Sequence, residues 1–258
     1  MKTKHLIAGI LTTIFICSSF VFVNGQQGDL SAVEIVKKAY DKMQGKSSMG
    51  EMSMTIVRPG WSRTVTMKSW SLGTDYTMIY ITSPAREKGH VFLKRKTEMW
   101  NWVPAIDRMI KLPPSMMMQS WMGSDFTNDD LAKADSIVVD YNHIHIKDEK
   151  MDGEEVLVIQ CDPKPKAAVV WGKIIIWIRK RGYVPLREGF YNEKGEMVKL
   201  LTFSDIRPVS GREVPMEMIM KNLKKDKHQT RIKYHILDFN PVIKKDIFSL
   251  GKLKRLGQ

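Results

Sequence analysis

The chain has 258 residues, of which 43% are hydrophobic and 27% charged, and this composition excludes a wholly disordered protein. Its 41 lysine and arginine residues against 28 acidic ones give a formal net charge of +13, which raises the question of nucleic acid or another anionic partner. Two cysteines exclude a disulfide-dense scaffold and a multi-cysteine metal site.

The first 25 residues have the pattern of a secretory signal peptide. Lys2 and Lys4 precede the uncharged run of residues 6–23, and Gly25 stands before a polar stretch. We expect cleavage after Gly25; a retained membrane anchor is the alternative, because the apolar run is nearly long enough to span a bilayer. Export predicts a periplasmic protein and argues against binding to nucleic acid as the role of the positive charge. An anionic membrane surface or an acidic partner is the expected target of that charge.

Residues 32–43 have the spacing of an amphipathic helix. Ser31 and Glu34, three residues apart, form a capping box at its start. Val33, Val36 and related positions recur at intervals of three and four, so one face of the helix is apolar and needs a surface to cover.

From residue 51 the apolar period changes to two, which indicates β-strands. In residues 51–57, Met52, Met54 and Ile56 share one face. Similar segments, separated by short turns, continue to residue 111 and resume over residues 137–239. We expect about 12 strands in a meander of hairpins.

Residues 113–130 interrupt this rhythm, with Thr127 and Asp130 placed to cap a short helix. Residues 156–159 and 174–178 are apolar on both faces, so these strands need cover on both sides. The expected fold is therefore mainly β, with residues 26–258 forming one domain: an incomplete, strongly curved antiparallel barrel. The N-terminal helix and the mid-chain segment are predicted to cover its concave face.

Catalytic and metal-binding signals are weak. The sequence has no G-x-S-x-G, H-E-x-x-H, P-loop or G-x-G-x-x-G motif. Cys161 lies in an apolar strand and is expected to be a buried small side chain. His143 and His145 share a strand face but lack an adjacent third ligand. We predict a protein that is not an enzyme and that uses no metal or cofactor.

Methionine and tryptophan give the stronger signal. Unbranched thioethers adapt to irregular apolar partners, which suits a cavity for acyl chains, although a methionine-rich core is an equally good interpretation. The candidate ligand-binding residues, in the cavity or on the segment that covers it, are Met52, Met54, Trp100, Trp102, Met116, Met117, Met118, Trp121, Met122, Phe126, Met216, Met218 and Met220.

Two segments carry a family resemblance. The run Met-Trp-Asn-Trp-Val-Pro-Ala-Ile-Asp-Arg at residues 99–108 and the run Met-Gly-Ser-Asp-Phe at residues 122–126 resemble the outer-membrane lipoprotein-sorting proteins, in the LolA-like branch typified by an uncharacterised treponemal protein. The likeness covers roughly residues 30–255. It implies a LolA/LolB-like half-barrel around an apolar cavity, and an arginine that tethers the covering segment, for which Arg63 is the candidate.

The resemblance implies a periplasmic carrier that shields the acyl chains of lipoproteins or lipids and delivers them toward the outer membrane. Hiding a chain from water is worth roughly 0.8 kcal/mol per methylene. Alternatives are a free-lipid carrier beside an inner-membrane lipid transporter, and an envelope adaptor that binds a membrane-protein partner. A hydrolase using Ser124 or Asp125 has little support. We expect a monomer.

Overall fold

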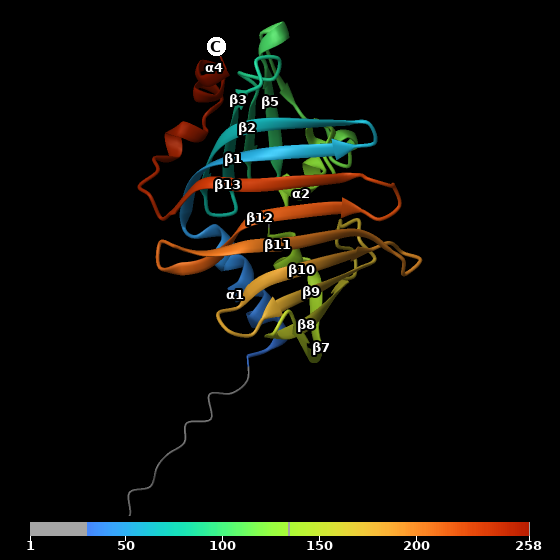
Figure 1. Ribbon diagram of the computed structural model, residues 1–258. Coiled ribbons are helices and arrows are strands. Elements are labelled where there is room, and N and C mark those ends of the chain that lie inside the picture. Colours follow the sequence, from blue (N-terminus) through green and yellow to red (C-terminus); the bar gives the residue numbers. More distant parts are fainter. Residues whose placement is uncertain (1–29, 134, 258) are drawn as a thin grey trace, which may run out of the picture.

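The computed structural model describes residues 30–133 and 135–257, and these form one curved antiparallel sheet with helices on both of its faces (Figure 1). The sheet has 13 strands in the order β6-β5-β4-β3-β2-β1-β13-β12-β11-β10-β9-β8-β7. The end strands β6 and β7 do not pair with each other within this described part, so the barrel is incomplete, as predicted.

The strands are β1 (Ser47–Arg58), β2 (Trp61–Leu72), β3 (Tyr76–Ser83), β4 (Val91–Arg95), β5 (Glu98–Val103), β6 (Arg108–Lys111), β7 (Tyr141–Met151), β8 (Glu154–Pro163), β9 (Lys173–Arg179), β10 (Val184–Tyr191), β11 (Met197–Val209), β12 (Arg212–Asn222) and β13 (Gln229–Phe239). The helices are α1 (Ala32–Gln44), α2 (Asn128–Ala132), α3 (Ser136–Val139), α4 (Leu250–Gly257) and the short 3₁₀ turns η1 (Pro104–Ile106), η2 (Pro114–Met116), η3 (Trp121–Gly123) and η4 (Lys245–Phe248).

The chain enters the sheet at its centre. Strand β1 pairs with β2 on one side and with β13 on the other. Strands β1 to β6 then run outward to one edge, and β7 to β13 return from the opposite edge. Residues 112–140, which we call the crossing segment, connect the two edges. Because this segment packs against both halves of the sheet, it passes over the concave face.

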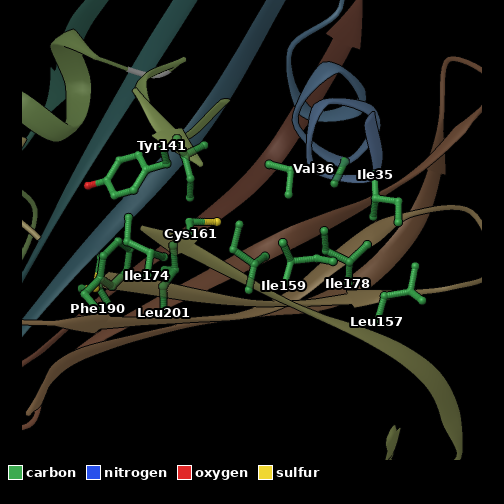
Figure 2. Close-up of a cluster of buried hydrophobic side chains, with 14 residues drawn as sticks. Ile35, Val36, Tyr141, Leu157, Ile159, Cys161, Ile174, Ile178, Phe190 and Leu201 are labelled. Carbon is green, nitrogen blue, oxygen red and sulfur yellow. The ribbon is translucent and has the colours of Figure 1, made fainter. Parts of the chain in front are cut away.

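Helix α1 covers the concave face of the half of the sheet that β7 to β13 form. The backbone N–H and the hydroxyl of Ser31 both donate to the Glu34 carboxylate, so the predicted cap forms. Figure 2 shows Ile35 and Val36 of the helix directed toward Ile159 and Ile178 of the sheet. Each such buried aliphatic side chain stabilises the fold by about 1.5–3 kcal/mol relative to an exposed one.

The outer face of β3, β4 and β5 is covered by the C-terminus of the chain. There η4 and α4 form a cap in which Phe248 and Leu253 are fully buried. A Cβ on Gly257 would overlap the ring of Trp102, so only glycine permits this close approach.

Two expectations about the strands need correction. The strands expected to resume at residue 137 begin at Tyr141, because Ser136–Val139 forms α3, and the described residues form 13 strands rather than about 12. The predicted signal peptide, residues 1–25, lies outside the described residues. Among the residues that are described, no helix has both the length and the apolar character needed to cross a bilayer.

Candidate functional site

The crossing segment lies on a methionine-rich apolar surface formed by β1 to β4. Alternation along β1 and β2 brings Met52 opposite Met67 and Met54 opposite Val65, with these side chains buried. We call this set the lid cluster; it comprises Met52, Met54, Ile56, Val65, Met67, Ile79, Ile81, Phe92 and Trp121. Thioethers at its centre can repack around a different apolar partner without loss of a specific geometry.

Trp121 fills the lid cluster from the crossing segment. Its ring lies edge-on to Phe92, with 5.4 Å between the ring centroids and 76° between the planes. Only 3% of Trp121 is exposed, and the following Met122 packs partly against the same cluster. The concave apolar surface is thus occupied by the protein's own side chains, and a ligand would have to displace them.

Polar contacts hold the crossing segment in place at Asp125. The Asp125 carboxylate accepts from Arg58 at 3.0 Å and from the Thr230 hydroxyl at 2.7 Å, and Lys199 donates to the Asp125 carbonyl at 2.6 Å. Arg58 also donates to the Gly123 carbonyl at 2.7 Å. The Arg58 and Asp125 side chains are 10% and 4% exposed, so their ion pair is well shielded from solvent. We call these contacts the latch.

Arg63 adds a second tether on β2. Its guanidinium donates to the Met122 carbonyl and forms an ion pair with Glu87. This is the arginine that the family resemblance suggested for holding the covering segment. Arg58, Lys199 and Thr230 were not predicted, because each lies in a different strand, far from Asp125 in sequence, and no spacing pattern links them.

Two clefts adjoin the crossing segment. One has a volume of about 340 Å³ and lies at the latch, between the Gly-Ser-Asp-Phe run and the turn that joins β12 to β13. The other, of about 310 Å³, lies beside Trp121 and Phe92 and extends to His90 and Asn101. Both are small compared with a diacyl lipid.

A buried carboxyl group links α1 to the sheet. Glu188 of β10 is 4% exposed and accepts a 2.6 Å hydrogen bond from the Tyr40 hydroxyl of α1. Loss of hydration raises the pKa of Glu188 to about 7, although the Tyr40 hydrogen bond acts in the opposite direction. Burial likewise raises the pKa of Tyr40 and of the nearby Cys161 thiol, so neither group is activated for chemistry.

Because the pKa of Glu188 is raised by burial, we expect the free energy of unfolding to depend on pH. Because the pKa of Glu188 rises from 4.5 to about 7 on folding, the folded protein retains a proton that the unfolded chain has released between those pH values. The contribution of the protonated Glu188 to the free energy of unfolding is therefore complete below pH 4.5 and is lost as the pH rises to about 7. We expect the free energy of unfolding to fall by about 3 kcal/mol across this range.

Urea unfolding of the wild type and of Glu188→Gln between pH 4.5 and 7.5 measures this effect. The glutamine keeps an acceptor for Tyr40 and cannot titrate, so its profile should lack the decline. If both profiles have the same slope, Glu188 is not the group responsible.

The predicted ligand-binding residues fall into separate groups. Met52, Met54, Trp121 and Met122 meet in the lid cluster, whereas Trp100 and Trp102 face the outer side of the sheet beneath α4. The other candidates divide between the crossing segment and the remaining clusters. Met116 and Met118 are exposed and Met117 is half-buried, Phe126 and Met218 pack against the cluster under α1, Met220 belongs to it, and Met216 packs with Val214 and Phe239.

The residues considered for a hydrolase, Ser124 and Asp125, form hydrogen bonds that serve the structure of the crossing segment. Ser124, Asp125 and His228 line one cleft, but the Ser124 hydroxyl bonds only the backbone of Phe126 among the described residues, and the Asp125 carboxylate is held by the latch. They therefore do not form the hydrogen-bonded chain of a nucleophile and its base. Within the described ranges, no three His, Cys, Asp or Glu side chains are grouped as a metal site.

Comparison with known proteins agrees with this architecture. A family model described as "-like: Uncharacterized protein" matches residues 73–255. A domain from Vibrio parahaemolyticus, assigned to outer membrane lipoprotein sorting, has a TM-score of 0.77 at 26% identity and covers 87% of this chain and 98% of its own. No curated protein matches the sequence.

Two further solved structures share the fold. A DUF1329 family protein from Desulfovibrio piger has a TM-score of 0.79 at 24% identity, covering 86% of this chain and 97% of its own. A LolA superfamily protein from Nitrosomonas europaea has a TM-score of 0.73 at 20% identity, covering 86% and 99%.

Proposed function

Because the chain belongs to the family whose model matches residues 73–255, within the LolA-like outer-membrane lipoprotein-sorting proteins, we propose that it is a periplasmic carrier of acyl chains. It sequesters the chains of lipoproteins or lipids against its concave face and releases them toward the outer membrane. It acts as a monomer, without a cofactor and without catalysis. The predicted signal peptide supports the periplasmic location.

The observation that carries this proposal is the lid cluster beneath a segment that is held both by the Trp121 side chain and by the polar contacts of the latch. A carrier needs a surface that accepts chains of variable shape and a cover that can move away from it. Buried methionines such as Met54 and Met67 supply the first, and the latch supplies the second. The clefts are too small for a lipid, so chains enter by displacing Trp121 and the crossing segment.

The energetics allow reversible binding. Each methylene that leaves water contributes about 0.8 kcal/mol, so a chain of ordinary length outweighs the cost of lifting one aromatic side chain and a few hydrogen bonds. Because the apolar contacts are non-directional, no single bond prevents release. The net positive charge favours approach to an anionic membrane surface.

A photoreactive fatty acid tests where chains bind. The purified protein is irradiated with a diazirine-bearing analogue, and the labelled peptides are identified by mass spectrometry. We expect saturable labelling of β1, β2 and the crossing segment, and protection by an unlabelled phospholipid. Labelling confined to the outer face near α4, or no saturable labelling, would contradict the proposal.

Paired variants on β1 provide a matched control. Met54 is fully buried in the lid cluster, whereas Met49 on the other face of the strand is 39% exposed. Met54→Gln should reduce labelling several-fold, because a buried amide without a partner opposes apolar contact, and Met49→Gln should leave labelling unchanged. Circular dichroism of both variants checks that the fold is retained, which the comparison requires.

One observation favours the second candidate function, binding of an envelope membrane-protein partner. The edge strand β7 exposes Ile144 and Ile146, which are 50% and 44% accessible and stand on either side of His145, where the pairing with β8 is interrupted by a bulge. An unpaired edge of this kind can accept a strand from another protein. Lysine at both positions should abolish such an association while leaving chain uptake intact.

A further inference from the structure

The cleft at the latch has an unusual charge. Arg58, Lys199, Lys225 and His228 all line it, and Asp125 is the only acidic side chain among the described residues of its wall. The Asp125 carboxylate already accepts from Arg58 and Thr230. Cations that converge in this way repel one another, so the arrangement favours an anion that enters from outside.

The cations differ in how firmly they are held. Lys199 is fixed by its 2.6 Å bond to the Asp125 carbonyl and lies 5.3 Å from the centroid of the Trp171 ring. Lys225 and His228 lie in and next to the β12–β13 turn, and the Lys225 ammonium forms no ion pair or hydrogen bond with any residue that the structure describes. The cleft therefore combines a donor that is already held by a hydrogen bond, Lys199, with the Lys225 ammonium, which has no such partner among the described residues.

Apolar side chains complete the cleft on the side of the crossing segment. Phe126 and Met118 line it together with the cations, and Phe126 also packs against the cluster under α1. One wall is thus cationic and the other apolar. This combination matches an amphiphile whose charged group lies at the latch while its chains run beneath the crossing segment.

We propose that this cleft binds a phosphate-bearing anionic group, and that the cargo of the carrier is an amphiphile of this class. The part of the inference that concerns the acyl chains rests on the proposed function. The anion site rests only on the residues that line the cleft. An anion here competes with the Gly123 and Asp125 oxygens for Arg58 and Lys199, so its binding loosens the latch. Recognition of the head group and entry of the chains are thereby coupled.

Two fluorescent lipids with identical chains test the proposal: pyrene-labelled phosphatidylglycerol, which carries a phosphate, and pyrene-labelled diacylglycerol, which does not. At low salt the wild type should bind the first about ten-fold more tightly, and the preference should shrink as salt is added. Lys225→Gln should remove most of the preference and leave diacylglycerol binding unchanged. Lys227→Gln, an equal loss of charge in the same turn but outside the cleft, should retain it.

Titration with inorganic phosphate, followed by calorimetry, distinguishes a head group from the free anion. Phosphate binding that Lys225→Gln weakens, with no preference between the two lipids, assigns the site to the free anion. Equal affinity for both lipids and no phosphate binding would overturn the anion site and leave chain uptake standing. Uptake of neither lipid would instead refute the proposed function, and the phosphate titration alone would then decide on the cleft.

Discussion

Asp125→Ala should release the crossing segment and lower its local stability by about 3 kcal/mol. Of the residues that the structure describes, Asp125 alone pairs its carboxylate with Arg58, and a buried guanidinium left without that partner is costly. It also deprives the Thr230 hydroxyl of its acceptor. Amide hydrogen exchange should therefore become about 100-fold faster in residues 120–130, with a much smaller change in β8 and β9.

The conservative variant and a surface control sharpen this experiment. Asp125→Asn keeps an oxygen for Thr230 and loses only the charge, so its effect should be smaller. Asp226→Ala, at an exposed position in the β12–β13 turn, should change nothing measurable. Exchange in residues 120–130 that is the same in Asp125→Ala and in the wild type would show that the latch does not hold the segment.

Trp121→Ala should destabilise the docked crossing segment by about 3–5 kcal/mol, because it empties the centre of the lid cluster. Trp121→Phe should cost less, since it retains contact with Phe92 and removes an indole N–H that has no partner among the described residues. Denaturant unfolding together with hydrogen exchange measures both effects.

The same position separates two roles for Trp121. If the ring occupies the place of the cargo, Trp121→Ala should bind a fluorescent fatty acid more tightly than the wild type, because less must be displaced. Trp121→Asp should bind it more weakly, since a carboxylate would then face the chain. Weaker binding by the alanine variant would instead make Trp121 a contact of the chain.

The sheet was predictable because its signal is local. Alternation in residues such as Met52, Met54 and Ile56 identifies both the strand and its buried face, and strands apolar on both sides predicted covers on both sides. The C-terminal cap was missed because α4 has only eight residues, two of them glycine, and so short a helix is not stable without tertiary contacts. Packing against Trp102 stabilises this helix, and the periodicity of the sequence does not indicate that contact.

The candidate site was predictable only in part, for a related reason. The methionine runs and the Gly-Ser-Asp-Phe segment are visible in the sequence, but the groups that hold Asp125 come from positions 67 and 105 residues away. Arg58 reads as a turn residue and Thr230 as an ordinary strand residue. Their role exists only once the strands are assembled.

The central position of β1 also determines how the chain can fold. Its partner β13 ends at Phe239, so the first strand to be made waits for the last before the middle of the sheet can close. Pairing over such a separation gives a high contact order and slow folding. Until then β1 is an unpaired edge, and such edges aggregate. Truncation before β13 would leave β1 without its partner at the centre of the sheet, so the segment that begins at Gln229 is indispensable to a strand near the start of the fold.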